Sequence, residues 1–188
     1  MFIPLRLSAQ TDEQLMQRAA RGNDRAFEEL YNRHARRLQG FFARRLGPDG
    51  DLAADFMHDA FLRLYAAREN YREGRSFRAW LYTIAYNLCK NHLRRPQSQT
   101  LSQSEERACL ADEDIELELD ASTLHDALHQ VLQALPESYA MLFSLHYEEE
   151  LTIPQIAQIT SLPEGTVKSR LHKTMNTIKQ QLRQYENR

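Results

Sequence analysis

The sequence has few of the residues that end helices or form turns: 6 glycines and 6 prolines among 188 residues. It also has almost none of the alternating, β-branched segments that are typical of strands. Together these shortages predict a mostly helical chain. Cysteine is rarer still, and Cys89 and Cys109 are isolated, with no Cys-x-x-Cys pair. We therefore expect no cysteine-based zinc site, and both thiols are expected to be reduced packing residues.

Long apolar segments are missing as well. The opening residues 1–7 are too few for the apolar core of a signal peptide. No apolar run approaches the length needed to cross a membrane. The sequence therefore predicts a cytoplasmic protein with no membrane insertion.

Motifs for catalysis and cofactor binding are also absent. The sequence contains no glycine-rich phosphate loop and no Gly-x-Ser-x-Gly nucleophile turn. His125 and His129 have the i, i+4 spacing of metal ligands, but no third ligand lies at a zinc-like spacing. A solvated helix face explains this pair better than a metal site. We expect a protein that is not an enzyme and has neither a metal nor a cofactor.

Charge of both signs is plentiful but unevenly distributed. The formal net charge is only −2, from 24 basic and 26 acidic residues. Residues 1–96 contain seventeen Lys or Arg and eleven acids, whereas residues 97–122 contain one Arg and eight acids. From residue 166 onward, six basic residues face one acid. Because a nucleic-acid footprint is local, the near-neutral total does not exclude DNA binding.

The segment from Leu151 to Lys173 predicts a helix-turn-helix. Thr152 and Gln155 have capping-box spacing, as do Ser161 and Glu164, so each helix has its own start signal. Apolar residues form an inner stripe on both helices: Ile153, Ile156, Ala157, Val167, Leu171, Met175, Ile178 and Leu182.

The residues left outside on the second helix carry positive charge and a hydroxyl, as in a helix that enters a major groove. These outward residues are Lys168, Ser169, His172 and Lys173. The alternative is an ordinary pair of bundle helices with a solvated basic face. We favour DNA binding.

Start and stop signals divide the chain into further helices. Thr11–Gln14 forms a capping box that opens a first helix, and Gly22–Asn23 closes it. Further helices are expected over 24–46, ended by Gly47–Pro48, and over 51–67, about 77–95 and 137–147, with a polar loop at 70–76. Residues 97–121 have the low hydrophobicity and like charge of a tether.

The predicted fold is therefore all-α. It consists of two small helical domains, residues 10–96 and 122–184, joined by a flexible acidic linker at residues 97–121.

The helix expected near residues 77–95 interleaves aromatic and basic residues, a combination that suits single-stranded nucleic acid. Its apolar residues, Trp80, Leu81, Ile84 and Leu88, have the spacing of a core stripe, and we favour the core for them. The polar residues are better placed for contact with DNA: Arg75, Arg78, Lys90, Asn91, Arg94 and Arg95.

Three of these blocks, residues 55–64, 76–81 and 87–95, closely resemble region 2 of bacterial sigma factors, and the small extracytoplasmic-function (ECF) type in particular. Residues 151–171 resemble region 4 of the same proteins. The resemblance covers about residues 10–95 and 122–184, in the same order and with the same linker length. It implies a sigma factor that binds core RNA polymerase and directs promoter recognition, DNA melting and transcription initiation at a specific regulon.

The resemblance also implies partners and site residues. The partners are core RNA polymerase, through its β′ clamp helices and β flap, promoter DNA, and an anti-sigma factor. Polymerase docking falls on Asp55, His58, Asp59, Leu62 and Arg63. Contact with the −10 element falls on Asn70, Tyr71, Arg72, Arg75, Ser76, Lys90, Asn91, Arg94 and Arg95. Contact with the −35 element falls on Thr166, Lys168, Ser169, His172 and Lys173.

Four residues depart from the common family pattern. Ala54 replaces a frequent acid, Tyr86 a frequent Arg and Asn91 a common Asp, while His172 replaces a more usual Arg or aromatic. His172 is where we expect altered reading of a −35 base.

Two other classes of protein compete with this interpretation. Residues 151–168 also resemble the output domain of response regulators, which would bind an operator without polymerase. A structural helical adaptor is the third class, and it would have no affinity for promoter DNA.

Overall fold

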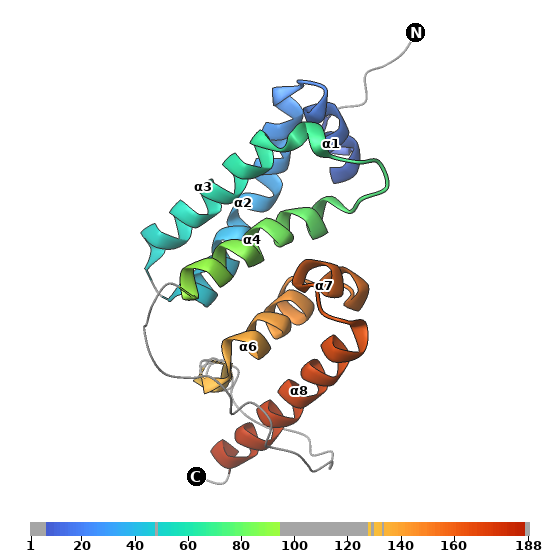
Figure 1. Cartoon of the computed structure of the whole chain (residues 1–188). Coiled ribbons are helices and arrows are strands. Elements are labelled where there is room, and N and C mark those ends of the chain that lie inside the picture. Colours follow the sequence, from blue (N-terminus) through green and yellow to red (C-terminus); the bar gives the residue numbers. More distant parts are fainter. Residues whose placement is uncertain (1–6, 48, 95–127, 129, 133, 187–188) are drawn as a thin grey trace. The chain divides into compact units, whose positions relative to one another are not determined.

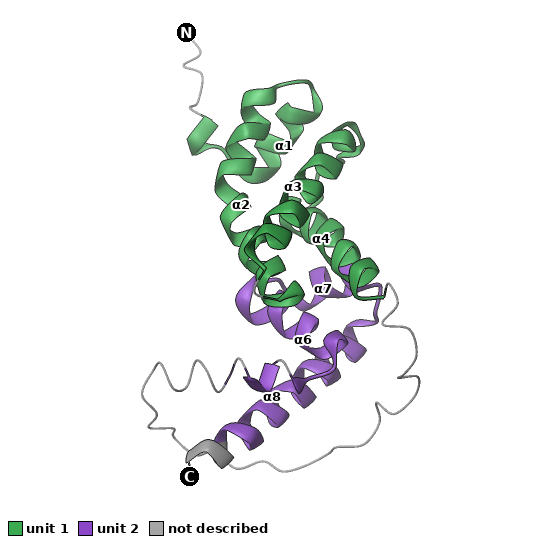
Figure 2. Cartoon of the chain, turned by 90° about the vertical axis from the view of Figure 1, so that its left-hand side faces the viewer, with its two compact units in different colours: residues 1–100 green, residues 101–188 purple. Residues whose placement is uncertain are grey.

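The computed structural model describes residues 7–47, 49–94, 128, 130–132 and 134–186, and side chains of these residues as far as 182. All regular elements within these ranges are helical. None of the described helices combines the length and the low polarity that crossing a membrane requires. The chain divides into two compact units, residues 1–100 and 101–188 (Figure 2). The predicted linker, residues 97–121, and the pair His125 and His129 lie outside the described residues.

Unit 1 contains four α-helices: α1 (Asp12–Ala20), α2 (Asp24–Leu46), α3 (Gly50–Ala66) and α4 (Phe77–Leu93). Two 3₁₀ turns, η1 (Leu7–Ala9) and η2 (Arg68–Asn70), precede α1 and follow α3. The long α2 packs against α1, α3 and α4 (Figure 1). This arrangement brings the loop between α3 and α4 to the end of the unit where α1 lies.

The helix starts of unit 1 follow their capping residues. The capping box at α1 is confirmed, because Thr11 Oγ1 accepts from Gln14 N at 3.3 Å and Gln14 Oε1 accepts from Thr11 N at 3.1 Å. Asn23 caps α2, and Gly47, with φ of +102°, ends it. Helix α3 begins one residue earlier than predicted, because Asp49 accepts from the first free amides of the helix.

The core of unit 1 is aromatic. Phe41 of α2 contacts both Phe42 and Tyr82 edge-on, with ring centroids 5.7 and 5.4 Å apart. Trp80, Leu81 and Leu88 of α4 are buried and Ile84 is half-buried, which confirms the core assignment of the α4 stripe.

Unit 2 contains α6 (Glu137–Phe143), a π-helical turn η3 (Ser144–Glu148), α7 (Ile153–Thr160) and α8 (Glu164–Glu186). The single helix predicted over 137–147 is thus an α-helix followed by a π turn. Glu149 N donates to Ser144 O at 2.9 Å, five residues back, which widens the turn. Helix α8 packs against α6 and α7 around a core that includes Leu142, Leu145, Ile156, Val167 and Leu171.

One predicted helix start in unit 2 is wrong. The box at Thr152 and Gln155 is present at α7, but Ser161 does not cap α8. Ser161 has φ of +59° and closes α7 in the left-handed conformation. Because α8 begins at Glu164, its N-cap position is 163, and Ser161 lies two residues before it.

Candidate nucleic-acid interface and docking face

One face of α3 points away from the core of unit 1. The core side of α3 is formed by Met57, Ala60, Phe61 and Leu64, whereas Asp55, His58 and Leu62 are exposed. The side chain of Leu62 is 69% exposed, the largest fraction among the exposed large hydrophobic residues of the described chain. Leu62 therefore offers an apolar contact to another protein beside the acids of this face.

Contacts with neighbouring side chains hold three polar residues of this face in place. Arg63 Nε and Nη2 donate to the two carboxylate oxygens of Asp59 at 2.9 and 3.0 Å. His58 Nε2 lies 3.0 Å from the hydroxyl of Tyr31 on α2. The five predicted docking residues therefore share α3, with Asp59 and Arg63 already paired.

The loop between η2 and α4 is built over a buried tyrosine. The ring of Tyr71 stacks on Trp80, with centroids 5.4 Å apart and planes 26° apart. Its hydroxyl donates to the carbonyl oxygen of Arg75. Tyr71 is only 9% exposed, and burial, reinforced by the nearby charge of Glu13, raises its pKa to about 12. Tyr71 is therefore a neutral support beneath the loop.

Of the other predicted −10 residues in this loop, Asn70 and Arg72 are exposed. Arg75 is half-buried, with its guanidinium carbon 5.4 Å from the centroid of the Trp80 ring. Ser76 Oγ accepts from Ala79 N at 3.3 Å and caps α4. The loop thus combines two exposed polar residues with three that hold its shape.

The far end of α4 presents a second polar group. Lys90, Asn91 and Arg94 are exposed, and the Lys90 ammonium lies 5.9 Å from the centroid of the Tyr86 ring. Helix α4 ends at Leu93, and Arg95 lies outside the described residues. The structure therefore places these cations on the helix that begins at the loop.

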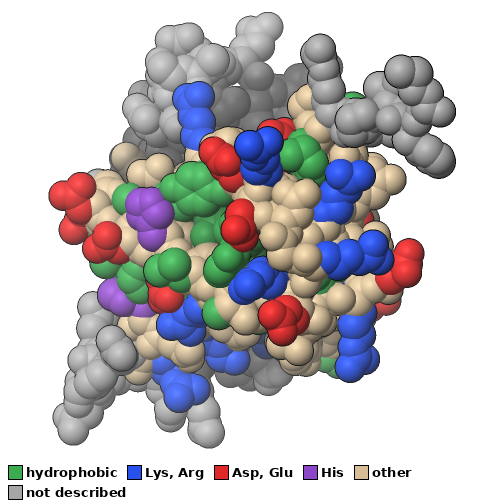
Figure 3. All heavy atoms as spheres, turned by 90° about the horizontal axis from the view of Figure 1, so that it is seen from above, with side chains coloured by type: hydrophobic (Ala, Val, Ile, Leu, Met, Phe, Trp, Pro, Cys, Tyr) green, Lys and Arg blue, Asp and Glu red, His purple; other side chains and the backbone are tan. Residues whose placement is uncertain are grey.

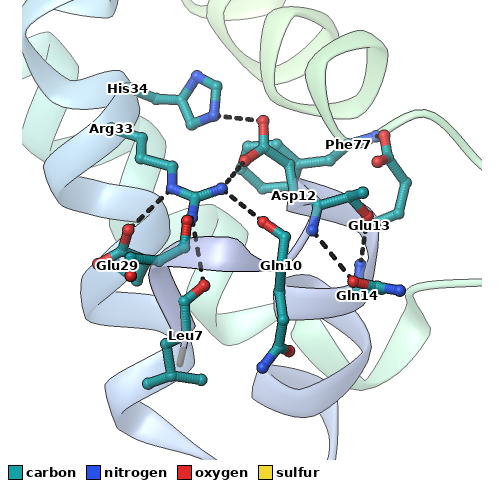
Figure 4. A network of polar contacts seen from close by, with 11 residues as sticks. Leu7, Gln10, Asp12, Glu13, Gln14, Glu29, Arg33, His34 and Phe77 are labelled. Carbon is teal, nitrogen blue, oxygen red and sulfur yellow. Dashed lines mark hydrogen bonds and ion pairs between the residues drawn. The ribbon is translucent and has the colours of Figure 1, made fainter. Parts of the chain in front are cut away.

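Arg33, a residue that sequence reasoning missed, ties the start of the chain to α2 (Figure 4). Its guanidinium donates to the carbonyl oxygens of Leu7, Ser8 and Gln10 and to the carboxylates of Asp12 and Glu29, over 2.9–3.2 Å. The i, i+4 spacing of Glu29 and Arg33 is a signal in the sequence. The carbonyl contacts leave no such signal.

Asp12 is the second member of this network. Its Oδ2 lies 2.7 Å from His34 Nε2. Burial raises the pKa of Asp12, but the hydrogen bond and charge of His34, followed by those of Arg33, outweigh burial and lower it below 3.8. The neighbouring Glu13 accepts from Phe77 N, the first amide of α4, at 3.2 Å (Figure 4).

On α8, the second helix of the predicted helix-turn-helix, the polar residues predicted to face outward are exposed, while neighbouring apolar residues are buried. Lys168, Ser169, His172 and Lys173 are exposed, while Val167 and Leu171 are buried. Thr166 is half-buried. Ser169 Oγ donates to Thr166 O at 3.1 Å, and His172 Nδ1 lies 3.4 Å from the Asn176 amide nitrogen. The residues predicted to contact the −35 element therefore lie together at the front of α8.

Charge is mixed on the surface that Figure 3 shows. Lys and Arg side chains alternate there with Asp and Glu, and hydrophobic side chains emerge between them. A surface of this kind does not bind DNA through a broad positive field. Among the described residues, no group of three His, Cys, Asp or Glu side chains could hold a metal ion.

Both units match known sequence families. Residues 30–99 match the family described as Sigma-70 region 2. Residues 125–182 match the family described as Sigma-70, region 4. The first match lies within unit 1 and the second within unit 2.

Individual relatives align along most of the chain. The RNA polymerase sigma-H factor of Pseudomonas aeruginosa is 32% identical over 192 residues, covering 92% of this chain and 94% of the relative. The ECF RNA polymerase sigma-E factor of Escherichia coli K12 is 30% identical, covering 89% of this chain and 92% of the relative. A solved structure of CnrH in complex with the cytosolic domain of CnrY has a TM-score of 0.68 at 25% identity, covering 91% of this chain and 96% of that one.

Proposed function

The chain belongs to the extracytoplasmic-function sigma factors of the sigma-70 family, and we propose that its exposed faces divide transcription initiation between them. A sigma factor directs RNA polymerase in transcription initiation and is not itself an enzyme. Units 1 and 2 contain regions 2 and 4 of this family. The proposal concerns which residues bind which partner.

The face of α3 that contains Leu62 docks on the β′ clamp helices of core RNA polymerase. Its support is the exposed Leu62, which Asp59 and Asp55 precede by one and two helical turns. Burial of Leu62 in the complex supplies the apolar contribution, and the charged residues set orientation. Ala54, half-buried beside this face, removes one acid that relatives often carry there.

The loop at 70–76 and the end of α4 hold the −10 element as a single strand. Asn70 and Arg72 of the loop and Lys90, Asn91 and Arg94 of α4 are the exposed groups available to bases and phosphates. Tyr86, half-buried on α4, borders these groups, and Arg95, outside the described residues, belongs to the same proposed −10 set.

The front of α8 reads the −35 element as duplex DNA. Lys168 and Lys173 contact phosphates, while Ser169 and His172 face base edges. For the acidic linker, which lies outside the described residues, we propose a course along the polymerase toward the RNA exit path, where its acids imitate nucleic-acid charge.

The energies of these contacts favour a polymerase complex that binds the promoter at two places, the −10 and the −35 element. Melting costs about 1.4 kcal/mol of stacking for each base-pair step. Stacking of a captured base on protein contributes about 1–3 kcal/mol, and each good base contact at −35 discriminates by a similar amount. Neither unit alone binds a promoter selectively. When both units are bound to one polymerase, the second DNA contact becomes effectively intramolecular.

We also propose an anti-sigma factor as a protein partner. CnrH, which is similar to this chain over nearly its whole length, was solved in complex with the cytosolic domain of CnrY. A protein that binds core RNA polymerase acts in the cytoplasm.

The single observation that carries the proposal is the separation of an acidic, leucine-bearing face from two basic faces on different helices. Run-off transcription with purified core polymerase on genomic fragments tests it. We expect discrete transcripts only when the chain is present. No specific transcript, together with tight DNA binding by the isolated chain, would instead identify an operator-binding regulator. Absence of any DNA affinity would identify an adaptor.

A further inference from the structure

Glu13 connects α1 to the first residue of α4, 64 positions away in the sequence. Its Oε1 accepts from Phe77 N at 3.2 Å. The first amides of a helix have no acceptor within the helix, and the positive end of the helix dipole favours a carboxylate. Glu13 thus acts as a cap for α4 that is supplied by another helix. Ser76 provides the second cap, through Ala79 N.

The opposite end of the same loop is also held. The Tyr71 ring stacks on Trp80 of α4, and its hydroxyl donates to Arg75 O. Between these two attachments lie Arg72, Glu73 and Gly74, all exposed. Gly74 has φ of +82°, a conformation that suits glycine and reverses the chain.

Glu13 also lies close enough to affect the buried tyrosine. After burial, the charge of Glu13 is the strongest influence that raises the pKa of Tyr71. His34, which binds Asp12 next to Glu13, packs its ring 5.1 Å from that of Phe77. The start of α1 is therefore fixed against the Phe77 end of the loop, as Figure 4 shows for Glu13, Asp12, His34 and Phe77.

We propose that Glu13 is a positioning residue for capture of a −10 base: by accepting from Phe77 N, it fixes the end of the loop that receives the base. The inference rests on the proposed role of the loop at 70–76. Glu13 does not contact DNA. It acts through the backbone of Phe77, so that the loop is ordered when the chain folds and not when DNA binds.

The test uses holoenzyme assembled from the full chain and core polymerase, on a promoter found by the run-off assay. Transcription is compared between that promoter and versions with one −10 or −35 base replaced. For Glu13→Ala, we expect discrimination at one −10 position to fall on the order of tenfold, the contribution of one good base contact. Discrimination at −35 and affinity for core polymerase should stay unchanged.

The matched variant is Glu13→Gln. It removes the charge but keeps a side-chain oxygen that can accept from Phe77 N. Discrimination should therefore be restored with Gln and lost with Glu13→Asp, which keeps the charge but is one methylene shorter. Glu28→Ala, at an exposed carboxylate of α2, should behave as the unmodified chain.

Three results would overturn the inference. One is unchanged −10 discrimination in both Glu13→Ala and Glu13→Asp. Another is Glu13→Gln behaving like Glu13→Ala, which would make charge the relevant property. The third is an equal loss at −10, at −35 and in core binding, which would show general destabilisation. Absence of specific transcription by the unmodified holoenzyme would instead contradict the proposed function itself.

Discussion

The guanidinium carbon of Arg170 on α8 lies 5.5 Å from the centroid of the Tyr139 ring on α6. Its neighbours Lys168 and Ser169 are exposed, whereas Arg170 is half-buried. One turn of α8 therefore contains both the exposed residues proposed to face DNA and a cation that holds α8 to the rest of unit 2. A count of basic residues does not separate these two roles.

Arg170→Ala should therefore affect stability more than DNA binding. Loss of the cation–π contact and of the packed side-chain stem should destabilise unit 2 by about 0.5–2 kcal/mol. Urea unfolding measures this change. The salt dependence of holoenzyme binding to a −35 promoter should stay the same. A lower salt slope would show that Arg170 contacts phosphate.

The double substitution Lys168→Ala and Lys173→Ala should weaken promoters that depend on the −35 element. Each phosphate contact that is lost should reduce the slope of log affinity against log salt by about 1. Binding of fluorescent promoter DNA to holoenzyme at several salt concentrations measures the slope. Lys179→Ala, further along the same helix, serves as the control. Loss of core binding in the double variant would contradict the division between units.

Leu62→Ala should weaken binding to core polymerase. Burial of a leucine side chain contributes about 1.5–3 kcal/mol, so we expect affinity to decrease by about 10- to 150-fold. Removal of an exposed side chain should leave thermal unfolding unchanged. Leu93→Ala, at an exposed leucine on α4, is the control for core binding. If the Leu62 variant and the unmodified chain bound core polymerase equally tightly, α3 would not be part of the interface.

Asp12→Asn should make unit 1 less stable at neutral pH and less sensitive to acid. The folded pKa of Asp12 lies below 3.8, its value in the absence of partners. The ionised carboxylate therefore stabilises the fold above this pH, and its contribution is lost as the pH falls through the folded pKa. Removal of a carboxylate bound by Arg33 and His34 should cost about 1–3 kcal/mol.

Urea unfolding of both chains between pH 5 and pH 3 measures this effect. The difference in stability between them should narrow as the pH falls. Glu28→Gln, at an exposed carboxylate of α2, is the control substitution. If the difference in free energy of unfolding between the two chains stayed constant from pH 5 to pH 3, ionisation of Asp12 would not stabilise the fold.

Local signals in the sequence predicted much of this structure. Capping residues located the starts of α1 and α7, since a cap acts within three residues of its own position. Helical periodicity assigned Trp80 and Leu81 to the core and placed Lys168 and Lys173 outside it.

Contacts between distant segments could not be predicted in this way. Nothing near Glu13 indicates Phe77 as its partner, and nothing near Tyr71 indicates that Trp80 buries its ring. Burial of Tyr71 also changes its place in the candidate site, from an exposed loop residue to a support. The error at Ser161 has a different cause, because the same residue type can start one helix or end another, and only the left-handed φ distinguishes them.

The π turn at Ser144–Glu148 has a geometric consequence for the whole helix-turn-helix. Each residue of an α-helix advances the chain by about 100° around its axis, and a π turn adds one residue without adding a turn. That extra residue therefore sets the direction, around the axis of α6, in which the chain continues into α7 and α8. A relative that lacks one residue between Phe143 and Leu151 would present its counterpart of α8 from a different angle, even with every residue of α8 unchanged.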